Sequence, residues 1–221
     1  LKRNLKDRGM RLACYTPEQV TYPVNNAAES ETLRHASISF FKRAAEISSD
    51  LDCPYLFVNG GWGEYDRSKS NAWDRAISSL KTIADYAQTL GVCCITESLQ
   101  PRESNLVLTA KDVKRCINDV GSANMKACLD IVAMAVQKET PTDHFQLYGD
   151  SIVHCHFQDG TPSGHLAWGD GELPLAQYLE EFDRFGFSGL FTPELTPSRY
   201  ALDPTSALNQ SVSRMREALG D

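Results

Sequence analysis

Four residues that can bind a metal ion each stand at or near the end of a short apolar segment. Glu97 closes VCCITE, Asp130 closes MKACLD, His156 stands near the end of IVHCHF, and Glu194 closes LFTPE. A charged side chain at the end of a buried strand is costly unless it is paired, hydrogen-bonded or coordinated. Three carboxylates and one imidazole form an oxygen-rich donor set that suits Mn²⁺, with Co²⁺, Fe²⁺, Mg²⁺ or Zn²⁺ as alternatives. We therefore predict that these residues share one divalent metal ion.

The alternative for each acid alone is structural. A single Asp or Glu at a strand end more often caps the next helix or forms a salt bridge, so the metal prediction depends on all four residues together. His154 lies two residues before His156, on the same face of the predicted strand. We expect His154 to donate to a backbone carbonyl or to orient its neighbour rather than to bind the ion.

The secondary-structure elements that must position these residues follow a regular order. Short apolar runs alternate along the chain with longer segments of helical period. Strands are predicted at 10–15, 55–60, 91–98, 125–130, 151–158 and 189–195, and helices at 29–48, 70–91, 173–185 and 204–219. This pattern is typical of parallel βα units, in either an open doubly wound sheet or a (β/α)8 barrel. No strand is followed by GxGxxG, which disfavours a dinucleotide-binding sheet. Polar residues at the carboxyl ends of strands favour the TIM barrel, as a single α/β domain over 1–221.

Composition narrows the class of ligand. The chain has 221 residues and a net charge of -7, so it lacks the basic surface that nucleic acids or anionic membranes require. No apolar run approaches the roughly 18 residues that a membrane span needs. The seven cysteines form no CxxC and lie mostly in apolar runs, which predicts reduced core thiols and a cytoplasmic location. A small-molecule ligand is therefore expected.

Several motifs resemble the xylose-isomerase-like superfamily of sugar phosphate isomerases and epimerases. Within it the chain is most similar to the fructoselysine 3-epimerase group, with the tagatose and allulose 3-epimerases more distant. The segments that carry the resemblance are CYTPEQVTYPVNN (14–26), ITESLQPRESN (95–105), CLDIVA (128–133), HCHFQDG (154–160), HLAWGDGELPL (165–175) and FTPEL (191–195).

The resemblance implies the same metal set, Glu97, Asp130, His156 and Glu194, usually with manganese. It also implies substrate contacts from Glu103 and His165, although Glu103 could instead be a solvated turn residue and His165 a surface residue. A TIM-barrel enzyme that acts on a sugar and assembles as a homo-oligomer is expected. Aromatic side chains on other loops, Tyr15, Trp62 and Trp168, could form the apolar walls of the pocket or could pack between loops.

Two positions depart from the allulose-type pattern. Allulose-type relatives have a histidine three residues after the metal aspartate, where this chain has Ala133. They have an arginine six residues after the metal histidine, where this chain has Pro162. Both changes remove contacts to a simple free ketose and favour a modified ketose such as a ketosamine. The family pattern also places a first βα unit before LKRNLKDRG, so we expect seven of the eight strands, with a short irregular one at 164–173.

The resulting prediction is a metal-dependent isomerase-class enzyme that inverts C3 of a ketose or fructoselysine-like ketosamine through a cis-enediolate. Glu97 and Glu194 are predicted to flank the substrate as the acid and base. The alternatives are an aldose–ketose isomerase of the same superfamily and a non-catalytic sugar-binding barrel. An endonuclease is disfavoured, because five histidines and an acidic chain offer neither a three-metal site nor a phosphate-binding groove.

Overall fold

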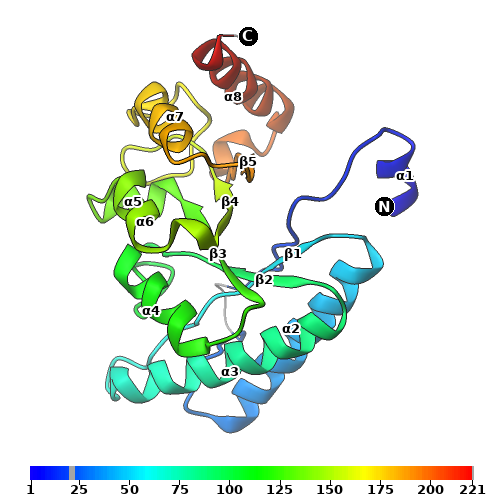
Figure 1. The fold of residues 1–221 in the computed structure, drawn as a ribbon, viewed down its shortest axis with the longest axis vertical. Coiled ribbons are helices and arrows are strands. Elements are labelled where there is room, and N and C mark those ends of the chain that lie inside the picture. Colours follow the sequence, from blue (N-terminus) through cyan, green and yellow to red (C-terminus); the bar gives the residue numbers. More distant parts are fainter. Residues whose placement is uncertain (20–22, 221) are drawn as a thin grey trace. The chain divides into compact units, whose positions relative to one another are not determined.

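The computed structural model describes residues 1–19 and 23–220, which form two compact units (Figure 1). The first unit comprises Leu1–Leu108 and Asp112–Ala127, and the second comprises Thr109–Lys111 and Cys128–Asp221. The single domain over 1–221 stays a prediction. Within the described residues, no helix is both long enough and apolar enough to cross a membrane.

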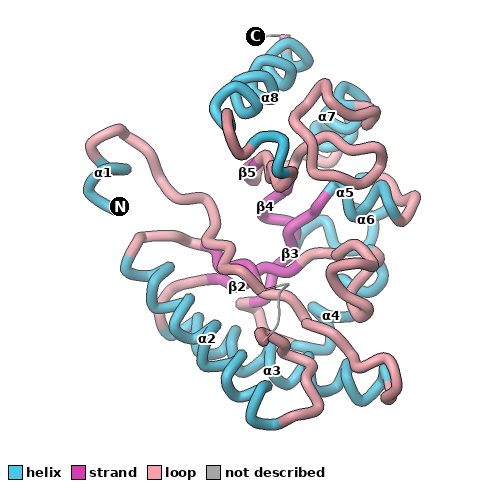
Figure 2. Tube along the Cα trace, turned by 180° about the vertical axis from the view of Figure 1, so that it is seen from behind, coloured by secondary structure: helices cyan, strands magenta, loops and turns pink. Residues whose placement is uncertain are grey.

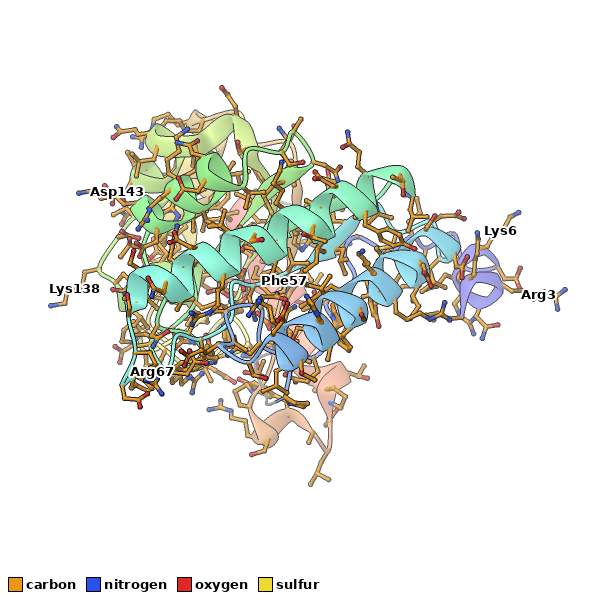
Figure 3. The ribbon with its side chains drawn as sticks, turned by 90° about the horizontal axis from the view of Figure 1, so that it is seen from below. Arg3, Lys6, Phe57, Arg67, Lys138 and Asp143 are labelled. Atoms are coloured by element: carbon orange, nitrogen blue, oxygen red, sulfur yellow. The ribbon has the colours of Figure 1, made fainter. Side chains whose placement is uncertain are left out.

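Parallel strands and two long helices make up most of the first unit. Its elements are α1 (Lys2–Lys6), α2 (Glu31–Asp50), β1 (Tyr55–Phe57), α3 (Lys69–Thr89), β2 (Cys93–Thr96), most of α4 (Ala110–Val120) and the start of β3 (Met125–Asp130). β1 pairs with β2 and β2 with β3, all parallel, with Leu56 opposite Cys94 and Ile95 opposite Lys126. α2 and α3 run side by side, and they contact β1 and β2, respectively (Figure 3). A parallel sheet covered by helices is the arrangement that the alternating pattern predicts.

Both long helices begin at a serine cap and turn one largely apolar face inward. The Ser30 side chain accepts from the Leu33 N–H, and the Ser68 side chain accepts from the Asn71 N–H. Each cap satisfies one backbone donor that the first helical turn leaves open. The faces that are buried include Phe41 and Ala44 to Ala45 on α2, and Leu80 and Ile83 to Ala84 on α3. Both buried faces therefore combine alanines with larger apolar side chains.

The second unit repeats the same βα order. It contains the end of β3, α5 (Ile131–Val136), α6 (Pro141–Tyr148), η1 (Gly149–Ser151), β4 (Ile152–His156), α7 (Leu175–Arg184), β5 (Leu190–Thr192), η2 (Ser198–Tyr200) and α8 (Pro204–Leu219) (Figure 2). β4 and β5 are parallel, with His156 opposite Thr192. The core of this unit is aromatic, with the Phe157 ring centroid 4.5 Å from that of Phe191 and 5.7 Å from that of Phe182.

The predicted elements agree with most of these bounds, and two predicted strands do not. Residues 10–15 form no strand, because only Tyr15 bridges to Leu56, through its N–H to Tyr55 O and its carbonyl to the Phe57 N–H. The irregular strand expected at 164–173 is reduced to one antiparallel bridge between Asp159 and Leu166. In both segments the backbone pairs at one bridge and forms no ladder.

The cysteines agree with the predicted core role. All seven are free thiols, and Cys53, Cys94, Cys116, Cys128 and Cys155 are buried. Burial raises the pKa of the Cys116 thiol to about 12, so this sulfur stays protonated and behaves as a small apolar group.

Candidate metal centre

Asp130 ends β3 and begins α5 at the same time. Its Oδ1 accepts a 2.6 Å hydrogen bond from the Ala133 N–H and so caps α5. Its Oδ2 accepts from Gln158 Nε2 at 2.9 Å and lies 3.2 Å from His165 Nε2. Burial by itself would raise the pKa of Asp130. The neighbouring imidazoles of His165 and His156, together with these hydrogen bonds, outweigh burial and hold the pKa below its ordinary value.

Three of the four predicted ligands meet within the second unit. His156 Nδ1 lies 3.3 Å from Glu194 Oε2 and 3.9 Å from Asp130 Oδ2. One ligand atom from each of Asp130, His156 and Glu194 lies within 4.8 Å of the other two. Two carboxylates and one imidazole at this separation can contact a single divalent cation, because metal–ligand bonds of about 2.0 to 2.6 Å place neighbouring donors this close. The strand ends therefore bring these three residues together as predicted.

His165 also faces this cluster, although it comes from the loop after β4. Its Nε2 lies 3.2 Å from Asp130 Oδ2 and 3.8 Å from Glu194 Oε2, and its Nδ1 lies 3.4 Å from Thr196 Oγ1. The side chain is buried, with a relative exposure of 6% for the residue. The alternative of a surface histidine is therefore wrong. Its contact with substrate stays a prediction.

Sequence reasoning assigned no role to two polar neighbours of the cluster. Gln158 joins Asp130 to the backbone N–H of Glu194, from which its Oε1 accepts at 3.2 Å. Thr196 contacts His165. Each lies two residues after a predicted ligand, so the period-2 alternation of a strand could have indicated them.

His154 packs edge-on against His156, with ring centroids 5.4 Å apart and planes at 90°. The expected hydrogen bond from His154 to a backbone carbonyl is absent, since neither ring nitrogen has a partner among the described residues. Burial, aided by the charge of His156, lowers the pKa of His154 to about 4, so its ring stays neutral. Its contribution to the position of His156 is therefore a packing contact.

The fourth predicted ligand, Glu97, belongs to the first unit. It directly follows β2 and is buried, with a relative exposure of 4%. A carboxylate at this depth needs a compensating partner, which agrees with the role of a ligand. Its place in the metal site stays a prediction.

The remaining predicted substrate residues are also in the first unit. The carboxylate of Glu103 accepts from the N–H and the side-chain amide of Gln100, at 3.0 and 3.1 Å, and so stabilises its own turn. Tyr15 bridges to β1 through its backbone. The backbone of Trp62 is held by Asn25 in two hydrogen bonds, of 2.9 and 3.1 Å. The contacts of these three residues with a substrate stay predictions.

Trp168 has a packing role in the second unit. Its ring is buried against Phe157, with centroids 5.0 Å apart, and its Nε1 donates to the Phe157 carbonyl at 3.1 Å. The indole is therefore part of the core under the loop.

Known proteins resemble this chain over nearly its whole length. The family model for the xylose isomerase-like TIM barrel matches residues 1–218. Fructoselysine 3-epimerase of Escherichia coli O157:H7 is 30% identical over 212 residues, which cover 95% of this chain and 77% of that protein. D-psicose 3-epimerase of Agrobacterium fabrum is 26% identical over 179 residues, which cover 79% of this chain and 60% of that protein.

Solved structures show the same fold. An L-ribulose 3-epimerase superposes with a TM-score of 0.83 at 18% identity, covering 99% of this chain and 77% of the other. A D-tagatose 3-epimerase-like protein superposes with a TM-score of 0.81 at 20% identity, covering 99% and 83%. The prediction of a TIM-barrel fold is thereby confirmed. With its strand-end acids and its match over residues 1–218, the chain belongs to the xylose isomerase-like TIM barrel family.

Proposed function

We propose that this protein is a divalent-metal-dependent epimerase that inverts C3 of a ketose or a fructoselysine-like ketosamine. Two of its relatives are a fructoselysine 3-epimerase and a D-psicose 3-epimerase. The observation that carries the proposal is the approach of Asp130, His156 and Glu194 at the ends of successive strands. Five contacts hold this group, and all of them join side chains of the same unit that come from β3, from β4 and the loop after it, and from the segment after β5.

The donor set fits a divalent ion such as Mn²⁺. Two buried or partly buried carboxylates near one imidazole repel each other unless a cation lies between them, and oxygen-rich sets with one nitrogen suit manganese. Glu97 would complete the set as a fourth ligand. When bound, the ion supplies Lewis-acid polarisation of the ketose carbonyl, which makes the C3 proton more acidic.

The protein side chains would then move the proton. One glutamate of the pair Glu97 and Glu194 takes the proton from C3 and leaves a cis-enediolate. The other returns a proton to the opposite face of the same carbon, which inverts its configuration. His165 and Glu103 would hold substrate hydroxyls, and Tyr15 and Trp62 would line the pocket.

Solvent isotope exchange tests this proposal directly. The protein is incubated with Mn²⁺ and a panel of ketoses and fructoselysine in D₂O, and deuterium at C3 is measured by NMR. We expect C3 exchange and inversion with the wild type and no exchange with Glu194→Gln. Glu180→Gln, at an exposed glutamate on α7 of the same unit, is the control.

The product of the reaction distinguishes the epimerase from the alternative functions. Inversion at C3 supports the epimerase, whereas an aldose product would indicate an aldose–ketose isomerase. Binding of sugar without exchange would indicate a non-catalytic barrel. Normal C3 exchange in Glu194→Gln would exclude the two-glutamate mechanism.

A further inference from the structure

Several backbone N–H groups of the loop between β4 and α7 donate to one buried carboxylate, that of Asp159. Asp159 is 2% exposed. Its Oδ1 accepts from the N–H groups of Gly160 at 2.8 Å and Leu173 at 3.0 Å, and its Oδ2 accepts from those of Gly169 at 3.0 Å and Gly171 at 2.9 Å. Four charge-assisted hydrogen bonds to backbone donors satisfy both oxygens without a metal ion. The charge of Asp159 is therefore used to fold the loop.

His165 stands inside the segment that this carboxylate holds. The backbone of Asp159 exchanges two hydrogen bonds with Leu166, of 2.8 and 2.7 Å, directly after His165. His165 itself has φ of 46°, in the left-handed region that is uncommon for residues other than glycine. Its Nε2 consequently lies 3.2 Å from Asp130 Oδ2.

The Gly171 backbone packs closely against the Asp159 carboxylate. A Cβ added at Gly171 would clash with that carboxylate and with the backbone N of Gly160. An amide of equal size would replace an acceptor oxygen by an NH₂ donor, which would face N–H groups that are themselves donors. Both the charge and the size of Asp159 thus contribute to the loop conformation.

We propose that Asp159 is a positioning residue for substrate binding, which acts through His165. Its carboxylate holds residues 160–173 so that the His165 imidazole faces Asp130 and the sugar hydroxyls that bind beside it. This inference rests on the proposed function, because it assigns the substrate contact of His165 to the same site.

A double-mutant cycle tests the coupling between the two residues. Asp159→Asn, His165→Ala and the double variant are compared with the wild type for the KM of the ketose, Mn²⁺ affinity by calorimetry and amide hydrogen exchange. We expect each single variant to raise KM by about tenfold, the effect of losing one hydrogen bond to substrate, and the double variant to raise it no further. Mn²⁺ affinity should fall by less than the KM rises, because Asp130, His156 and Glu194 are retained and Gln158 still donates to Asp130 Oδ2. The Gly169 and Gly171 amides should exchange faster in Asp159→Asn.

A second substitution loosens the same contact without changing Asp159. Gly171→Ala places a methyl group against the Asp159 carboxylate and the Gly160 backbone N, the donor of one of its four hydrogen bonds, and the Gly171 backbone is outside the left-handed region. We expect the same rise in KM, and this variant decides the question if Asp159→Asn does not fold. Asp183→Asn, at an exposed position on α7, controls for the loss of one charge.

Three outcomes would overturn the inference. They are a wild-type KM in both Asp159→Asn and Gly171→Ala, additive effects in the double variant, or a loss of Mn²⁺ affinity equal to the rise in KM. A wild type that binds no Mn²⁺ and exchanges no C3 proton would overturn the proposed function and this inference together. An active wild type with an unaffected Asp159→Asn and Gly171→Ala would overturn the inference alone.

Discussion

Gln158 holds Asp130 from the neighbouring strand end. Its Nε2 donates to Asp130 Oδ2 at 2.9 Å, and its Oε1 accepts from the Glu194 N–H at 3.2 Å. The side chain is fully buried, so water does not compete for either bond. One neutral amide thus sets the orientation of a carboxylate oxygen and the backbone position of a second candidate ligand.

Replacement of Gln158 should weaken metal binding while all proposed ligands remain. We expect Gln158→Leu to lower Mn²⁺ affinity by about 10- to 100-fold, the usual cost of removing a group that orients a ligand. Isothermal calorimetry measures the affinity, and Gln177→Leu at an exposed position on α7 is the matched control. An unchanged affinity in Gln158→Leu would show that Asp130 does not depend on this hydrogen bond.

Metal removal should lower the stability of the folded chain. A ligand that binds only the folded state stabilises it by about 2.7 kcal/mol at 100 times its dissociation constant. We therefore expect EDTA to lower the melting temperature and excess Mn²⁺ to restore it. His156→Ala should abolish this response, whereas His35→Ala, at an exposed position on α2, should retain it. A Mn²⁺ effect that persists in His156→Ala would place the ion elsewhere.

Local patterns predicted the elements whose ends carry their own signals. The strand predicted at 125–130 is found as β3, and the helix predicted at 204–219 is found as α8. Pro204 follows the capping Asp203, and Gly220 ends α8 at φ of 81°, so each boundary is chemically marked. In contrast, α5 is a run of apolar residues directly after a strand, and periodicity alone cannot separate it from more strand.

The candidate site was predictable where charge marks a strand end. Asp130, His156 and Glu194 are such residues, and they come together. Gln158 was missed although it lies two residues after His156, because a neutral amide, unlike a carboxylate at a buried strand end, does not require a metal ion or an ion pair. The role of Asp159 could not be predicted from the sequence either. Its four backbone partners are distributed over residues 160–173, and no local pattern specifies which of these N–H groups face it.

A buried histidine away from the metal centre should contribute to stability alone. His144 Nε2 lies 3.0 Å from Glu139 Oε2, and its Nδ1 contacts the Tyr148 hydroxyl. Glu139 also accepts from the Ala110 N–H at the start of α4, at 3.0 Å. We expect His144→Phe to lower the free energy of unfolding by about 1 to 3 kcal/mol, since buried polar partners lose a hydrogen bond. Urea denaturation measures this change. His35→Phe is the control, and an equal effect in both variants would contradict the prediction.

The loop around Asp170 should make stability depend on acidity. Asp170 Oδ2 accepts from the Tyr200 hydroxyl at 2.6 Å, and Asp170 Oδ1 accepts from Gln210 Nε2 at 3.0 Å. These bonds, together with Arg199, lower the pKa of Asp170 below its ordinary value of 3.8. As the pH falls, the Asp170 carboxylate is therefore protonated at a higher pH in the unfolded chain than in the folded chain. The stabilisation is fully present above the ordinary pKa and is lost as pH falls through the lowered one.

Asp170→Asn should accordingly be less stable than the wild type near pH 7, and the difference should narrow as the pH falls below about 4. Urea unfolding at a series of pH values, with the exposed Asp183→Asn as the control for the loss of one charge, measures the difference. A gap that stays constant or widens toward low pH would mean that the Asp170 carboxylate is not preferentially ionised in the folded state. The hydrogen bonds from Tyr200 and Gln210 would then stabilise the loop independently of its charge.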